Sequence, residues 1–339
     1  MGPMTKTPPD LPSIPIHDYR DQNMLAFVRD HRAAALDLMK TVIRGLGPAG
    51  RMLGPVLPAA DRLARRRLLA MRDPYRLEIR KIERLLGRPG PVAFNLSYEF
   101  GCTARAFETD QAPVLFRTLD WPFRGLGERI RIVQLPGEAG DWVLATWPGV
   151  VGCLQGTAAG RFAAALNQAP ERTSRLGRAV AWLGSKRAFL KATGLPPAHL
   201  LRLAFETAPD FASAKRMLTE TPLAAPVIYT LVGTKPGETC TIERTETEAE
   251  VASAPAAANH FATALEQQTS WRPRGIDSEG RHQSALAAQE APDLDNIAPP
   301  ILNDLTRLAV RMDASGQMAV MGYDADRPVT ALTRIGPAI

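Results

Sequence analysis

The chain has 339 residues, of which 45% are hydrophobic and 22% charged, so it is long and apolar enough to bury a substantial core. Its three cysteines, Cys102, Cys153 and Cys240, cannot all pair and form no C-x-x-C spacing, which argues against a disulfide scaffold and favours reduced thiols. The first twenty residues lack the apolar stretch of a signal peptide, and no later run reaches the roughly 18 apolar residues of a membrane span. We therefore expect a globular, cytoplasmic protein.

The net charge of +6 comes from one region. Residues 51–100 contain 11 Lys and Arg against 5 Asp and Glu, a surplus equal to the whole net charge. The densest part, DRLARRRLLAMR from Asp61, interleaves arginines with leucines as an amphipathic helix does, and it lacks aromatic residues that would stack on bases. We interpret it as a solvated helix face and expect no nucleic-acid partner. Peripheral contact with an anionic membrane or an acidic partner stays open.

The first ninety residues are helical in pattern. Apolar residues recur near helical spacing within residues 20–47, with Asp21 as the expected N-cap. A second helix is predicted from Pro74 until it ends at Gly87. The run VAFNLSYEFG (92–101) then alternates apolar and polar residues, which predicts a strand ending at its final glycine.

Strand patterns, separated by Gly and Pro, dominate the rest of the chain. An antiparallel meander is predicted from strands within residues 112–121, 129–135, 141–152 and 160–168. Helices follow within residues 196–208 and 209–222, and strands resume within 225–234, 238–246 and 248–254. The pattern is completed by a loop at 291–300, a short helix near Ile301 to Arg311, and strands within 317–324 and 328–335. This order predicts a layered α+β domain better than a doubly wound parallel sheet.

Cys102 follows Gly101 at the end of the first predicted strand. Taken alone it could be an ordinary buried thiol, because free cysteine packs as a small hydrophobe. His260 and His282 could each serve a Cys-His pair, but nothing in the sequence places either one beside Cys102. We expect Cys153 and Cys240 to be core residues.

The surroundings of Cys102 resemble the start of the catalytic part in choloylglycine hydrolases and acid ceramidases, two families of N-terminal-nucleophile (Ntn) hydrolases. In GCTARAFETDQAPVLFRTLDWPF (101–123), a Cys-Thr pair precedes an Arg-x-x-Asp motif, here Arg117 and Asp120, on the next strand. RFAAALNQAP resembles the family strand that ends in an oxyanion-hole asparagine, here Asn167.

Two later segments continue this resemblance. ASAPAAANHF resembles the segment that supplies a second oxyanion-hole asparagine, here Asn259, and DSEGRHQSAL resembles the one that carries a late active-site arginine, here Arg281. The match spans roughly Asn95 to Ser284. It implies an Ntn-hydrolase αββα sandwich, in which two antiparallel sheets lie between helical layers. Residues 1–101 would be a helical leader ending in the first strand, and residues 102–339 the catalytic part.

The resemblance implies an amidohydrolase that cleaves the Gly101–Cys102 bond and then a linear N-acyl amide, through a Cys102 thioester and without cofactor or metal. The freed α-amine, with a reference pKa of about 7.7 to 8.0, would take the thiol proton. Arg117 would lower the thiol pKa, and Asp120 would orient the α-ammonium. Arg281 would support Asp120 or the α-amine. The leader and catalytic fragments would stay associated.

Other interpretations stay open at this stage. A related acyltransferase would use the same fold, and a non-catalytic paralogue would bind a membrane or a protein through its basic leader. Arg117 and Asp120 could form a surface ion pair, and Arg281 judged alone would be solvent-exposed. The substrate's acyl chain is expected in an apolar pocket built from leader residues, namely Met24, Leu25, Phe27, Met39 and Met52.

Overall fold

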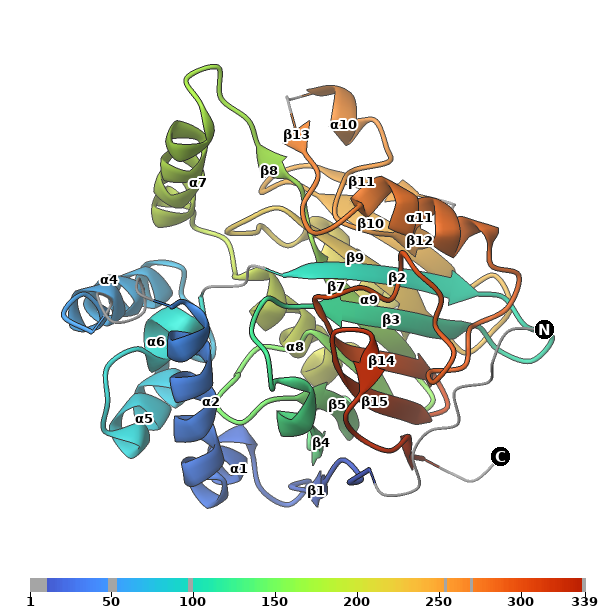
Figure 1. The fold of residues 1–339 in the computed structure, drawn as a ribbon, viewed down its shortest axis with the longest axis horizontal. Coiled ribbons are helices and arrows are strands. Elements are labelled where there is room, and N and C mark those ends of the chain that lie inside the picture. The colour runs from blue at the N-terminus through green and yellow to red at the C-terminus, as the bar shows by residue number, and fades with distance from the viewer. Residues whose placement is uncertain (1–10, 48–53, 97–99, 253–254, 269–270, 337–339) are drawn as a thin grey trace.

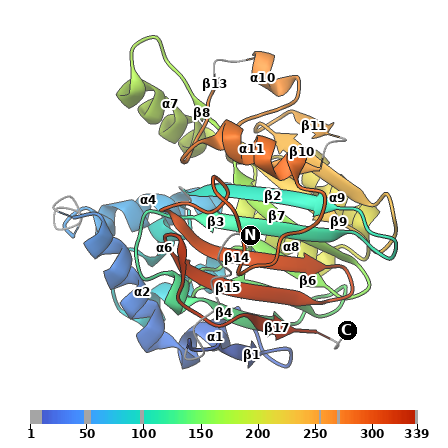
Figure 2. The same ribbon diagram turned by 45° about the vertical axis from the view of Figure 1, so that its right-hand side comes forward.

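Two large sheets form the centre of the protein (Figures 1 and 2). The computed structural model describes residues 11–47, 54–96, 100–252, 255–268 and 271–336. The first sheet runs in the order β1 (Ile16–Asp18), β4 (Arg131–Leu135), β5 (Trp142–Thr146), β6 (Gln155–Ala158), β7 (Phe162–Gln168), β9 (Val227–Val232), β10 (Thr239–Arg244) and β11 (Ala249–Ala252). Its neighbouring strands are antiparallel, except that β1 and β4 pair in parallel.

The second sheet is antiparallel and contains the strand that carries Cys102. Its order is β12 (Ala256–Ala257), β2 (Gly101–Phe107), β3 (Val114–Asp120), β14 (Thr306–Asp313), β15 (Met318–Asp324) and β16 (Arg327–Pro328), with β17 (Thr333–Ile335) also paired to β15. Side chains alternate between its two faces. Leu115 and Leu119 of β3 pack in the core shared with the first sheet, whereas Phe116 packs in a separate outer cluster with Ala285.

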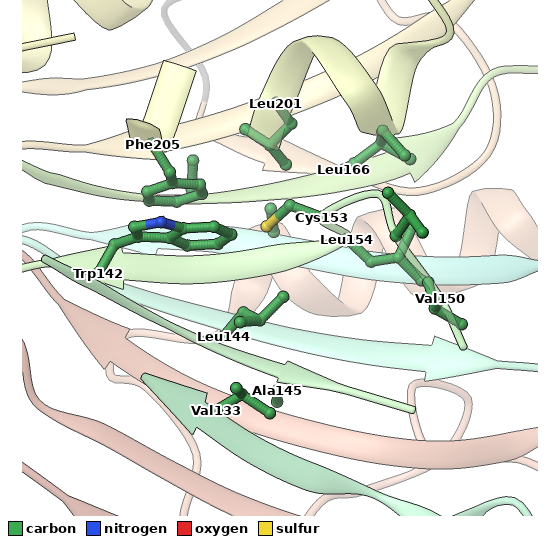
Figure 3. Close-up of a cluster of buried hydrophobic side chains, with 14 of the residues drawn as sticks. Val133, Trp142, Leu144, Ala145, Val150, Cys153, Leu154, Leu166, Leu201 and Phe205 are labelled. Atoms are coloured by element: carbon green, nitrogen blue, oxygen red, sulfur yellow. The ribbon is translucent and has the colours of Figure 1, made fainter. Parts of the chain in front are cut away.

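Helices cover the outer faces of both sheets. The first sheet is covered by α8 (Pro197–Thr207) and α9 (Phe211–Glu220), and α11 (Ser278–Ala287) packs on β2 and β12 of the second. Figure 3 shows how α8 is held: Phe205 stacks on Trp142 with ring centroids 5.2 Å apart, and Cys153 lies in the same buried cluster. The four layers form the αββα sandwich expected from the sequence, and both Cys153 and Cys240 lie in the core, as predicted.

The described part of residues 1–101, the expected leader, contains a group of helices at one end of the sandwich (Figure 1). They are α1 (Met24–Asp30), α2 (Arg32–Gly45), α4 (Leu57–Ala70), α5 (Arg76–Leu86) and α6 (Pro91–Phe94). Their buried residues, such as Phe27 and Ile79, belong to the same hydrophobic core as the sheets. In the described part of the chain, no helix combines the length and the apolar character that crossing a membrane would require.

The chain also contains smaller elements. They are η1 (Gly127–Arg129), α7 (Arg178–Lys191), α10 (Leu265–Gln268) and the two-stranded ribbon of β8 (Glu171–Arg172) and β13 (Trp271–Arg272). The sequence patterns did not predict α7 or β6. The single helix expected within residues 20–47 is interrupted at His31, and its first cap is Asn23 rather than Asp21, because the Asn23 side chain accepts from the Ala26 N–H.

Two predicted elements are wrong in type. Where a strand was predicted over 92–101, the first residues form α6, and the strand β2 starts at Gly101 instead of ending there; residues 97–99 lie outside the described part of the chain. Gly90 has a φ of 118° and Pro91 follows it as the first helical residue, so the chain turns here into a short helix. The helix predicted near Ile301 to Arg311 is mostly β14, which is buried on both faces, so that its apolar run carries no clear alternation.

Candidate active site

Cys102 lies on the face of β2 that is turned toward the first sheet, and its side chain is fully buried. Arg117 approaches it from β3, where it is paired with Ala104. The Arg117 Nη2 donates to Cys102 Sγ at 3.1 Å and to the Leu166 carbonyl oxygen at 2.8 Å. Gln155 on β6 accepts from Nη1 of the same guanidinium. A buried cation therefore lies directly against the thiol.

Burial raises the pKa of the Cys102 thiol, because a medium of low dielectric disfavours the thiolate. The Arg117 guanidinium acts in the opposite direction and is the second cause. The sequence led us to expect a lowered pKa, and the net direction in the intact chain is upward because the side chain has no exposed surface. The thiol therefore needs a base before it can act as a nucleophile.

Arg281 holds the backbone side of Cys102 from the opposite face of β2. Its Nη1 donates to the Cys102 carbonyl oxygen and, at 2.9 Å, to Thr103 Oγ1. Its Nε donates to the Ile276 carbonyl oxygen at 2.7 Å, which fixes the guanidinium at the start of α11. Arg281 is fully buried, so the solvent-exposed position that the residue alone would suggest is wrong.

Asn259 holds the nitrogen of Cys102. Its Oδ1 accepts from the Cys102 backbone N–H at 2.7 Å and from Arg281 Nη2 at 2.9 Å, while its Nδ2 donates to the Gln168 carbonyl oxygen at 2.8 Å. Two donors at Oδ1 and an acceptor at Nδ2 are consistent with this orientation of the amide. The side chain thus bridges the start of β2 and the end of β7.

Asp120 lies opposite Gly101 in the β2–β3 pairing. Its carboxylate accepts from Thr306 Oγ1 and from Asn303 Nδ2, both at 3.0 Å, and it lies 3.8 Å from Arg281 Nη1. Burial raises the pKa of Asp120, and the guanidinium and these two donors oppose that shift. Asp120 and Arg117 are three residues apart on one strand, so they lie on opposite faces of the sheet and do not form the surface pair considered above.

The glycine before Cys102 is closely packed. A Cβ at Gly101 would lie 3.2 Å from the Asp120 Cβ, 3.3 Å from its Oδ2 and 3.5 Å from the Gly275 Cα. The φ of Gly101 is not in the left-handed region, so the backbone conformation does not itself demand a glycine here. The 275 loop packs over the Gly101–Cys102 bond.

Asn167 lies beside the Asn259 segment rather than at the thiol. Its Nδ2 donates to the carbonyl oxygens of Ala257 at 3.1 Å and Ala258 at 3.2 Å, and its buried Oδ1 has no hydrogen-bond partner among the described residues. In the intact chain, the hydrogen bonds found for Nδ2 of Asn167 and of Asn259 go to backbone carbonyl oxygens and not to the thiol.

Sequence reasoning missed the residues that hold the site in place. Gln155 fixes Arg117, Asn303 and Thr306 fix Asp120, and the Ser278 hydroxyl accepts from the Asn259 backbone N–H at 2.8 Å. Thr306 could have been found only if β14 had been predicted as a strand paired with β3, because that pairing sets Thr306 opposite Asp120. We predicted a helix there, so the pairing was missed.

A pocket of about 140 Å³ adjoins the site. Leu166 and Gln168 line this pocket, and their carbonyl oxygens accept from Arg117 and Asn259 of the site. Its apolar wall includes Leu96, Phe100 and Phe189. Its polar wall contains two ion pairs, Arg172 with Glu246 and Arg272 with Glu171, in which Arg172, Glu246 and Glu171 line the pocket. The leader contributes Leu96 and Phe100 instead of the expected Met24, Leu25, Phe27 and Met39, and Met52 lies outside the described residues.

No family model matches the sequence, and no curated protein matches it. Among solved structures, an N-acylethanolamine-hydrolyzing acid amidase (NAAA) ortholog from Caenorhabditis elegans is 19% identical, with a TM-score of 0.45 over 63% of this chain and 93% of that one. Two mutants of a conjugated bile acid hydrolase from Clostridium perfringens are 11% and 12% identical, with TM-scores of 0.42 and 0.41 over 69% of this chain and 92% of theirs. The site described above is defined by this chain's own contacts.

Proposed function

We propose that the protein is a cysteine Ntn-amidohydrolase that cleaves its own Gly101–Cys102 bond and then hydrolyses a linear N-acyl amide through a Cys102 thioester. One observation carries the proposal: the thiol, nitrogen and carbonyl of a single residue each have a buried polar partner, which are Arg117, Asn259 and Arg281. Packing alone requires none of these. Cys153, which is equally buried, lies among apolar side chains (Figure 3).

Self-cleavage begins with an N-to-S acyl shift, in which the Cys102 Sγ attacks the Gly101 carbonyl carbon. The thiol proton passes to the Cys102 nitrogen as the carbon–nitrogen bond breaks, and Gly101 becomes a thioester on Sγ. Water then attacks this thioester, which releases the Gly101 carboxylate and restores the thiol. Arg117 favours this sequence because its guanidinium stabilises negative charge on Sγ.

The freed nitrogen then becomes the base that the buried thiol lacks. The α-amine of Cys102 takes the thiol proton, Sγ attacks the acyl carbon of the substrate, and the departing amine carries the proton away. The α-amine of Cys102 then activates the water that hydrolyses the acyl thioester. Asn259 Oδ1 already accepts from this nitrogen, and the Asp120 carboxylate lies opposite the preceding residue, so both support an α-ammonium here.

Oxyanion stabilisation by Asn167 and Asn259 requires a change after cleavage. Asn167 Nδ2 donates to two carbonyl oxygens in the intact chain, so Asn167 must exchange at least one of these partners for the oxygen of the tetrahedral intermediate. Asn259 Nδ2 donates to the Gln168 carbonyl oxygen and must turn one hydrogen toward that oxygen.

We also propose that the leader stays bound after cleavage. Asp73 ahead of α5 bonds His199 of α8 at 2.6 Å with both side chains buried. Arg202 of α8 donates to Glu78 of α5 at 2.6 Å, and the Tyr75 hydroxyl donates to Glu206 at 2.7 Å. Separating the fragments would expose this network together with the shared hydrophobic core, which is unfavourable.

The pocket beside Cys102 favours an apolar acyl group, because most of its wall is aliphatic or aromatic. A panel of fatty-acyl, bile-acid and phenoxyacetyl amides, followed by amine release, tests the substrate class, with Cys102→Ala as the inactive control. Shortening a preferred acyl chain should lower kcat/KM by about fourfold for each methylene lost, which corresponds to roughly 0.8 kcal/mol. A kcat/KM that is unchanged between about twelve and two carbons would contradict the assignment of this pocket.

A further inference from the structure

Asn259 is held by a hydrogen-bond chain that leads away from Cys102. Its backbone N–H donates to Ser278 Oγ at 2.8 Å, and the same Oγ lies 2.8 Å from Nδ1 of His260. The Asn259 carbonyl oxygen accepts from the Arg274 N–H at 3.1 Å, so the backbone of this residue is tied on both sides. Ser278 is 3% exposed and Asn259 is fully buried.

The proton inventory allows one assignment that uses both bonds of the serine. The Ser278 oxygen accepts the Asn259 N–H, and its single proton can be donated to Nδ1 of His260. We assign this direction, in which His260 is neutral and carries its proton on Nε2. Burial, together with His282 and Arg281 on α11, lowers the pKa of His260 to about 4, so the ring is neutral at ordinary pH.

Ser278 is placed by the start of α11. Asp277 caps this helix by accepting from the Gly280 N–H at 3.0 Å, and Asp277 itself adopts a left-handed φ of 40°. Ser278 is the next residue and Arg281, which contacts the Cys102 carbonyl, lies one turn later. One helix terminus therefore presents both the arginine and the serine to the site.

We propose that Ser278 is a positioning residue, oriented by His260, that fixes the Asn259 amide against the nitrogen of Cys102. The inference rests on the proposed function, in which that nitrogen becomes the catalytic base. Loss of the hydroxyl leaves the buried Asn259 N–H unpaired and allows the residue to shift. The side-chain amide would then no longer meet the Cys102 nitrogen at hydrogen-bond distance, although the thiol and Arg117 would be unchanged.

The experiment compares Ser278→Ala, Ser278→Thr and His260→Phe with Ser315→Ala, which removes an exposed hydroxyl in the β14–β15 turn. Self-cleavage is followed by intact mass, and kcat and KM for the best amide are measured on cleaved protein. Ser278→Ala should lower kcat by roughly 10- to 100-fold with KM within about threefold, and Ser278→Thr should restore most of the loss. His260→Phe should lower kcat by roughly three- to tenfold. Ser315→Ala should match the wild type.

A second comparison keeps the proposal falsifiable if Ser278→Ala also loses stability. In an Asn259→Ala background, Ser278→Ala should have no further effect on kcat, because the two residues act through one contact. Additive losses, an unchanged kcat in Ser278→Ala, or a Ser278→Thr variant as slow as Ser278→Ala would overturn the positioning role. A wild-type protein that neither cleaves itself nor hydrolyses amides would instead refute the proposed function.

Discussion

The two faces of β3, the strand paired with the one that carries Cys102, present different charged groups near that residue. On the inner face, between the sheets, Arg117 meets the thiol, and the neighbouring acceptors Gln155 and Leu166 are neutral. On the outer face, Asp120 receives bonds from two neutral donors and lies near the guanidinium of Arg281. The inner cluster has a cation as its charged group, whereas the outer one has charges of both signs.

This difference matches the two charges that the proposed reaction would create. The inner cation suits a thiolate, which would otherwise be disfavoured by burial. The outer carboxylate suits an α-ammonium, which forms on the backbone side of Cys102 once the chain is cut. Because strand residues alternate, an Arg-x-x-Asp motif supplies one group to each face, and its three-residue spacing has a structural reason.

The largest effect is expected from Arg117→Ala, which removes the inner charge. Thioester formation should slow by about 100- to 1000-fold, the loss typical of a donor aimed at developing charge. Arg244→Ala is the matched control, since Arg244 is a buried arginine that bonds carbonyl groups far from the thiol. Rates are compared with thermal unfolding in both variants. Rate losses that only follow the loss of folded protein would make Arg117 a structural residue.

A smaller effect is expected from Asp120→Asn, which removes the outer charge. Amide hydrolysis should slow by roughly 10- to 100-fold, because the α-ammonium loses its counter-ion. Burial raises the pKa of Asp120, so its carboxylate is lost as pH falls through a value above the ordinary 3.9 or so, and the acid limb of the wild-type profile should begin there. That limb should be absent in Asp120→Asn. Asp61→Asn, a buried leader aspartate, should keep it.

Gly101→Ala tests the close packing of Gly101 against Asp120, beside the bond that we propose is cleaved. The added methyl would press on the Asp120 side chain, so self-cleavage should slow by about tenfold. Protein that has been cleaved should hydrolyse amides at the wild-type rate, since residue 101 then belongs to the leader. Gly184→Ala meets no atom within 4 Å and is the control. Cleavage at the wild-type rate in Gly101→Ala would show that the packing is unimportant.

Tyr75→Phe should have the smallest effect on catalysis. It removes the hydroxyl that donates to Glu206 but keeps the ring under Arg202, whose guanidinium carbon lies 4.1 Å from the ring centroid. The free energy of unfolding should fall by about 1 kcal/mol while kcat is unchanged. A selective loss of kcat without a change in unfolding would instead connect the leader interface to the chemistry.

The sequence was most informative where a strand has a clear pattern of its own. The strand predicted within residues 112–121 is β3, whereas its partner β2 begins at Gly101, where the predicted strand was expected to end, so the pairing of Gly101 with Asp120 was not predicted. The layered α+β order was also correct, because long periodic segments such as α8 and α9 are governed by local pattern.

The supporting residues could not be found in this way. Gln155, Ser278 and Thr306 are single polar residues far along the chain from Cys102, and no local motif distinguishes them from surface residues. They act through tertiary contacts that depend on sheet order and on where α11 begins. The upward pKa shift of the thiol was missed for the same reason, since burial of a side chain depends on the packing of both sheets.

The most direct test of the central claim is the intact mass of the chain under denaturing conditions, measured over time and pH beside Cys102→Ala. The account predicts that the wild type divides into a leader of residues 1–101 and a fragment that begins at Cys102, and that amide hydrolysis rises in step with cleavage. The Cys102→Ala chain should remain whole and inactive. A wild-type chain that stays whole and yet hydrolyses amides as fast as any cleaved sample would contradict the account.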